Sequence, residues 1–242
     1  MMILSLILSL VPLPQDTAEK TATQAVDAFK KAFKGTDPEK NAAIEDLAKV
    51  QHPKTISKLI SILTAPEPTN VRVTAARVLG KFTEHKKPAA AALVNVLAAT
   101  LKDPNIFGPI CDALGELQEP SVVPALVRYF EEKDEFVAKR TLWAAGKIGS
   151  PAPIDTIIAL LARQEKILKA NSDNTGVGVS ANNNNSTGAA GVVAGPDTRA
   201  RDRAQGLASG ANQALKDITK ESNTTAEAWA AWWAKNKATF KK

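Results

Sequence analysis

The stretches AARVLGKF at residues 75–82 and ICDALGEL at residues 110–117 are the strongest indication of the fold of this chain. Each places a glycine at the same point of an apolar helical pattern, and AIEDLAKV and LWAAGKIG repeat the arrangement. The small residues are Ala48, Gly80, Gly115 and Gly146, at spacings of 32, 35 and 31 positions. A period of this size predicts an array of stacked helical units, because one such unit cannot bury its apolar face alone.

Each unit of the repeat is predicted to contain two helices. Apolar residues recur at i, i+3, i+4 and i+7 in both helices of a unit, as in Phe107, Ile110, Cys111 and Leu114. Glycine inside a helix costs about 1 kcal/mol relative to alanine, so its repeated use requires a reason. Because small residues allow helix backbones to approach closely, we expect them where the first and second helices of a unit cross.

The repeated residues resemble a known family. Val71-Arg72 followed by AARVLGKF, and ALGELQEPSVVPAL at 113–126, are similar to short HEAT repeats of the type found in phycobilisome lyases. The resemblance covers about residues 38–165 and implies an all-α fold, a right-handed α-α superhelix of about four to five helix pairs. Most such proteins are interaction scaffolds, although some relatives are bilin lyases or nucleic-acid enzymes. The Val-Arg pair is intact only in the second unit, as Val71-Arg72.

The chain divides into five predicted parts. Residues 1–15 are apolar and uncharged, too short for a membrane span and suited to the core of a signal peptide, although they lack Lys or Arg and an Ala-x-Ala site. A misplaced start or an apolar cap strand are the alternatives. An N-terminal capping helix at 16–36 precedes the HEAT-like repeats at 37–170. An Asn- and Gly-rich flexible loop is predicted at 171–198, and a C-terminal helical cap with a Trp-rich helix at 199–242.

Acidic residues before prolines predict where two helices of the array begin. Asp37-Pro38 and Asp103-Pro104 each combine an expected N-cap residue with a proline suited to the first helical position.

Candidate binding residues come from two places. Aligned second helices present outward rows that contain Lys58, Asn95 and Arg128, among small and weakly polar neighbours. The last predicted helix carries Trp229, Trp232 and Trp233 along one face. Its resemblance to the closing helix of exported bacterial HEAT-like proteins implies a cap over the end of the array, and an aromatic anchor for a partner or glycan is the alternative.

No enzyme site, metal or cofactor is expected. The only cysteine, Cys111, lies on an apolar helix face, and both histidines, His52 and His85, are predicted in loops between helices. The net charge of +6 is spread along the chain, with no run of more than two adjacent cations.

We therefore expect a non-catalytic scaffold that binds another protein. The predicted signal peptide places it in the periplasm or outside the cell, with no membrane span after its removal. Nucleic-acid binding by a basic solenoid, or a lyase-like activity, are the alternatives; the aligned rows contain no basic stripe, so nucleic acid is not the expected partner.

Overall fold

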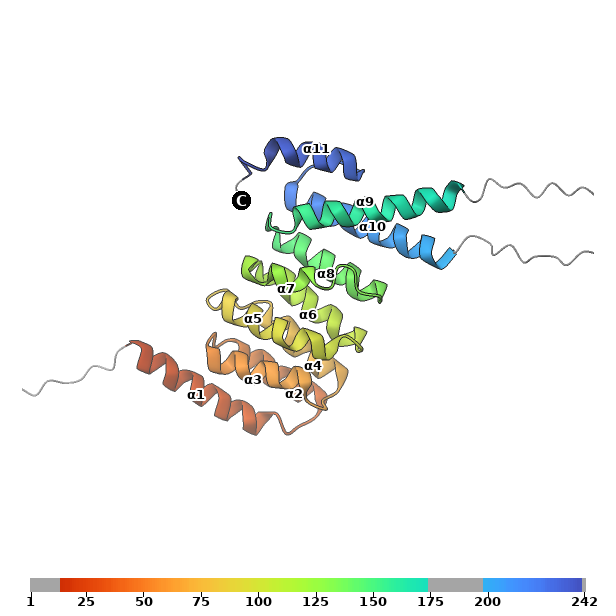
Figure 1. The fold of residues 1–242 in the computed structure, drawn as a ribbon. Helices are drawn as coiled ribbons and strands as arrows, with labels where there is room; N and C mark the ends of the chain where they lie inside the picture. The colour runs from red at the N-terminus through yellow and green to blue at the C-terminus, as the bar shows by residue number, and fades with distance from the viewer. Residues whose placement is uncertain (1–13, 174–197, 241–242) are drawn as a thin grey trace, which may run out of the picture.

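The computed structural model describes residues 14–173 and 198–240, and every regular element within these ranges is a helix (Figure 1). The elements are α1 (Pro14–Ala32), α2 (Asp37–Ala48), α3 (Pro53–Thr64), α4 (Thr69–Leu79), α5 (Lys86–Leu97), η1 (Ala98–Thr100), α6 (Pro104–Leu117), η2 (Pro120–Val122), α7 (Val123–Val127), α8 (Glu135–Ile148), α9 (Ile154–Asp173), α10 (Thr198–Thr219) and α11 (Ala226–Asn236). The predicted all-α class is confirmed.

The helices form two stacked layers (Figure 1). In the first layer α2, α4, α6, α8 and α10 contact one another in that order. In the second layer α3 contacts α5, and α9 contacts α11, with α7 between these two pairs. Each second helix also packs on the first helix of the next pair, as α3 does on α4 and α9 on α10. We count as a pair each first-layer helix with the second-layer helix that follows it in the chain. The described residues then make five pairs, within the predicted four to five: α2/α3, α4/α5, α6/α7, α8/α9 and α10/α11.

The start of α2 differs by one residue from the predicted cap. Thr36, rather than Asp37, is the N-cap residue, and Asp37 is the first residue of the helix. The Glu39 carboxylate accepts hydrogen bonds from the Thr36 amide at 2.7 Å and from its hydroxyl at 2.8 Å. These bonds lower the pKa of Glu39, and they satisfy a backbone donor that the helix itself leaves free.

The arginine of the Val-Arg pair has a structural place between pairs. Asp103 is the N-cap residue of α6, but its carboxylate contacts Arg72 Nη1 at 2.9 Å instead of capping the helix. Arg72 Nε also donates to the Leu63 carbonyl at the end of α3, at 2.8 Å. One side chain on α4 therefore joins the preceding pair to the following one.

The small residues of the repeat lie against the next helix of the first layer. A Cβ atom on Gly80 would be 2.9 Å from the Cα of Ala113 in α6, and one on Gly146 would be 3.0 Å from the Cα of Ala214 in α10. Gly115 lies in the same way against α8. The prediction that these residues mark the crossing of two helices within one pair was wrong. The three glycines mark positions where the backbone of one pair comes close to the next pair.

Ala48 ends α2 and lies at the first junction of the array. Here a cleft of about 340 Å³ lies between α2 and α4, lined by Ala48, Val78 and Lys81 among others. A methyl group therefore has room at this position, whereas a Cβ atom on Gly80 or Gly146 would lie within 3.0 Å of a backbone atom of the next helix.

The helices α9 and α10 are longer than their neighbours and extend beyond the stack (Figure 1). Gln164 is the last buried residue of α9, and Ala204 is the first buried residue of α10. We call residues 165–173 and 198–203 the overhang. The loop predicted at 171–198 is shorter than expected at its start, because α9 continues through Asp173; residues 174–197 lie outside the described residues.

Helix α1 covers the first end of the array. It contacts both α2 and α3, and its own residues Ala22 and Phe29 are buried. Because α1 begins at Pro14, only the last two residues of the predicted signal peptide are described, and residues 1–13 lie outside the described part.

Helix α11 covers the other end and contacts α9. Trp229 is fully buried, and its Nε1 donates to Asn212 Oδ1 of α10 at 2.8 Å. Trp233 is 7% exposed and donates to Asp155 Oδ1 of α9 at 2.9 Å. The Trp-rich helix is thus tied to both layers, and α10 with α11 forms the fifth pair.

Candidate functional site

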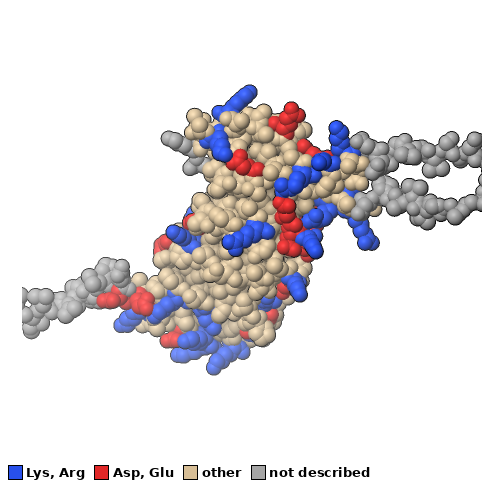
Figure 2. All heavy atoms as spheres, viewed as in Figure 1, with Lys and Arg blue, Asp and Glu red and all other residues tan. Residues whose placement is uncertain are grey.

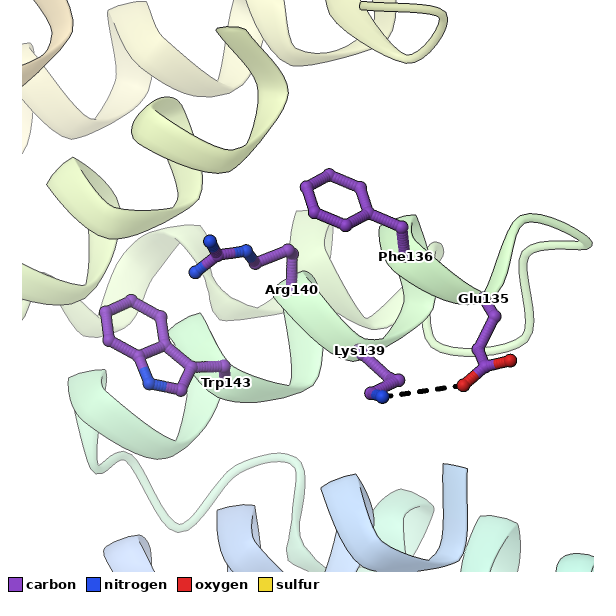
Figure 3. A pocket seen from close by; sticks show the side chains of 5 residues that line it. All are labelled: Glu135, Phe136, Lys139, Arg140 and Trp143. Atoms are coloured by element: carbon purple, nitrogen blue, oxygen red, sulfur yellow. Dashed lines mark hydrogen bonds and ion pairs between the residues drawn. The ribbon is translucent and has the colours of Figure 1, made fainter. Parts of the chain in front are cut away.

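A groove of about 490 Å³ runs along α8 in the first layer (Figure 3). It is lined by five side chains of this one helix, namely Glu135, Phe136, Lys139, Arg140 and Trp143. Phe136 is 37% exposed and Trp143 is half-buried, so aromatic surface is open to solvent along the groove. We call this surface the α8 groove.

The aromatic rings of the groove lie against glycines of α6. A Cβ atom on Gly108 would be 3.3 Å from Phe136 Cζ, and one on Gly115 would be 3.1 Å from Trp143 Cζ3. The two glycines are seven residues apart, as are the two aromatic residues, so each pair spans about two helical turns along one face. Because glycine has no side chain, each ring packs on the α6 backbone with one side, and its other side can remain accessible to solvent.

The first turn of α8 is fixed where Phe136 lies. The Asp134 carboxylate accepts a hydrogen bond from the Phe136 amide at 2.8 Å, which satisfies a free donor of the helix end. The same carboxylate accepts from the Val137 amide at 3.4 Å. The two hydrogen bonds to the Asp134 carboxylate therefore fix the backbone at Phe136, the first aromatic residue of the groove.

Charged side chains in the groove are paired with neighbours. Arg140 Nη1 lies 3.0 Å from Asp112 Oδ1 of α6, and its guanidinium is 5.5 Å from the centre of the Phe136 ring. Burial raises the pKa of the Asp112 carboxyl, and the Arg140 charge opposes that increase. On the α10 side, Lys139 lies 3.5 Å from Glu135. The groove thus combines aromatic surface with a guanidinium held in place by its neighbours.

The residue types that line the α8 groove are suited to contact with a protein partner. Trp and Arg in a partly enclosed setting are the residue types that dominate the energetics of protein interfaces. Among residues 14–173 and 198–240, no group of three His, Cys, Asp or Glu side chains is placed to hold a metal ion. Cys111 is buried, and burial raises the pKa of its thiol far above the usual range, which keeps it protonated.

The residues predicted from the outward rows lie in the second layer, away from the α8 groove. Asn95 on α5 and Arg128 after α7 are exposed. Lys58 on α3 is half-buried, with its ammonium 5.5 Å from the centre of the Phe29 ring of α1. Lys58 therefore helps to hold the N-terminal helix.

The three tryptophans of α11 differ in exposure. Trp229 and Trp233 are buried, while Trp232 is half-buried between them and Phe240. The ring of Trp232 is stacked on Trp233 at a centroid distance of 6.3 Å. Only Trp232 offers substantial surface to a partner.

Sequence reasoning missed Phe136, Arg140 and Trp143. These residues follow the i, i+4, i+7 spacing of one helix face, which was the available signal. That spacing is equally typical of a buried face, because sequence alone does not show that the opposing residues of α6 are glycines.

Comparison with known proteins identifies the repeats. The profile of the HEAT repeats matches residues 26–105 and 94–172, which together cover more than half of the chain. A search of curated proteins gave no match. None of the described helices is both long enough and apolar enough to cross a membrane.

Proposed function

This chain belongs to the HEAT-repeat family, and we propose that it is a non-catalytic scaffold that binds another protein in the cell envelope after export. HEAT arrays present extended surfaces formed by stacked helices, which are suited to contact with other proteins. The main support for this proposal is the α8 groove. It places Phe136, Arg140 and Trp143 together on one accessible helix face.

The polar contacts of the array support a structural rather than a catalytic use of its charges. Arg72 joins α3 to the start of α6, and Arg140 joins α8 to α6. His52 Nδ1 accepts a hydrogen bond from the Lys54 amide at 3.2 Å at the start of α3, so one of its two nitrogens is used as a cap. These groups hold helices in place instead of facing a common reaction centre.

We expect a photo-crosslinking residue in the α8 groove to capture a protein partner. Benzoylphenylalanine at position 139 lies beside Phe136 and Arg140, whereas at position 102 it replaces a lysine that is exposed outside the groove. Irradiation in cells of the source organism should give one discrete protein adduct from position 139 and none from position 102. The measurement is the mass shift of the crosslinked band and its sensitivity to protease.

The control combines position 139 with Phe136→Ala, which removes exposed aromatic surface and should reduce the adduct about tenfold or more. Equal adducts from positions 139 and 102 would contradict the groove as the binding surface. An adduct that is destroyed by nuclease would favour the nucleic-acid alternative.

Export is proposed from the composition of residues 1–15, which are apolar and uncharged up to Asp16. We expect the full chain to appear in the envelope or extracellular fraction with its N-terminus shortened. Leu6→Arg with Leu8→Arg should hold it in the cytoplasm at full length, because charge in the apolar core prevents its use as a signal. Cell fractionation and intact-mass measurement test this, and an unprocessed cytoplasmic wild type would contradict it.

A further inference from the structure

The overhang of α9 and α10 carries a concentration of basic side chains. Lys166, Lys169, Arg199 and Arg201 are exposed, and no ion pair joins any of them to another described residue. Figure 2 shows basic side chains gathered at the end of these two helices. By sequence, the overhang contains five basic residues, Arg203 being the fifth, and three acidic residues, Glu165, Asp173 and Asp202. These 15 residues therefore contribute +2 of the net charge of +6.

Two of the remaining charges in the overhang have structural partners. The Glu165 carboxylate accepts a hydrogen bond from the Ala226 amide at 3.0 Å, at the start of α11. Arg203 Nη2 donates to the Glu132 carbonyl at 2.6 Å. The four exposed cations therefore face solvent, with Asp202 as the only other exposed charged side chain described among them.

An exposed aliphatic residue lies between Lys166 and Lys169 in the sequence of α9. Ile167 is 39% exposed, one of two large apolar residues with such exposure in the described part of the chain. It directly follows Lys166 on a stretch of α9 that has no buried residue. A projecting helical end that combines cations with an exposed aliphatic group can place the cations at lipid headgroups and the aliphatic group at the acyl boundary.

We infer that the overhang is a docking surface for an anionic lipid bilayer. Single-stranded nucleic acid is less suited to it, because neither α9 nor α10 contains an aromatic residue on which bases could stack. A phosphate backbone also offers no favourable environment to Ile167. Lys166, Ile167, Lys169, Arg199 and Arg201 are not among the residues that line the α8 groove, so substitutions in the overhang leave the groove residues unchanged.

Vesicle flotation with the full chain tests this inference. Wild type should float with vesicles containing 40% phosphatidylglycerol in low salt, remain unbound with phosphatidylcholine alone, and dissociate at about 0.5 M salt, where charges are screened within a few ångströms. Each neutralised cation lowers membrane partition by roughly fivefold. The variant K166Q/K169Q/R199Q/R201Q should therefore bind more than 100-fold more weakly.

The matched control is K31Q/K34Q/K81Q/K102Q, which removes the same charge from exposed lysines elsewhere. It should bind within about threefold of wild type, and all proteins share the apolar residues 1–13, so any contribution from that stretch cancels. Ile167→Ser leaves the charge unchanged and should weaken binding by several fold. Circular dichroism confirms that each variant is folded.

Equal loss in the matched control would overturn the inference, since net charge alone would then explain binding. Equal binding of wild type and the overhang variant to anionic vesicles would also overturn it. If wild type binds DNA more tightly than anionic vesicles at the same salt, and the overhang variant loses that binding, the overhang is a nucleic-acid surface instead.

Discussion

Replacement of Trp229 with alanine is expected to lower the free energy of unfolding by about 3–5 kcal/mol. The indole is fully buried, donates to Asn212 of α10 at 2.8 Å, and contacts Trp232 edge-on. Its loss leaves a cavity beneath α11 and an unpaired amide oxygen on α10. Because α11 covers α9 at the end of the array, we expect the last helix pair to loosen first. Chemical denaturation followed by circular dichroism gives the magnitude, and hydrogen exchange shows which helices lose protection.

Trp232→Ala is the matched control, because it removes the same ring from the same helix at a half-buried position. We expect it to cost about 1–2 kcal/mol, in proportion to the smaller area withdrawn from water. Equal costs for the two substitutions, or no cost at Trp229, would contradict the capping role of α11. If Trp232→Ala weakens partner binding without a change in stability, that ring is the exposed anchor considered as the alternative role of the tryptophans.

Gly80→Ala is expected to destabilise the protein by about 1–3 kcal/mol, although alanine is the better helix former. The added Cβ would lie 2.9 Å from the Cα of Ala113, a backbone atom that cannot move without displacing α6. The methyl group therefore forces two neighbouring pairs apart. The free energy of unfolding and the protection of α4 and α6 amides from hydrogen exchange measure this effect.

Gly210→Ala provides a control of opposite sign. The position lies inside α10, and its new Cβ would be 3.5 Å from Leu142 Cδ1, which is an ordinary contact. With no clash, the gain in helix propensity should stabilise the protein by about 0.5–1 kcal/mol. If both substitutions stabilise the chain, the close approach of α4 and α6 does not constrain position 80.

The candidate site was much less accessible from sequence than the fold. Lys58, Asn95 and Arg128 were chosen because solenoids commonly bind along their second helices, and the first of these proved to pack on Phe29. The α8 groove instead depends on Gly108 and Gly115, which lie about one unit earlier in the chain. Which face of α8 stays open depends on contacts between units, and the pattern of one helix does not contain that information.

The helices, their pairing and the repeat could all be predicted from the amino-acid sequence, because apolar periodicity and a small residue every 31–35 positions are local properties of the chain. The sequence also indicated that a Trp-rich helix closes the array. The folded structure was needed to show what the repeated glycines face, which tryptophans are buried, and where α9 and α10 leave the core. These features depend on the distances between successive pairs. Such distances are set by how whole helix surfaces fit together, with Gly80 against Ala113 and Gly146 against Ala214 as two close contacts.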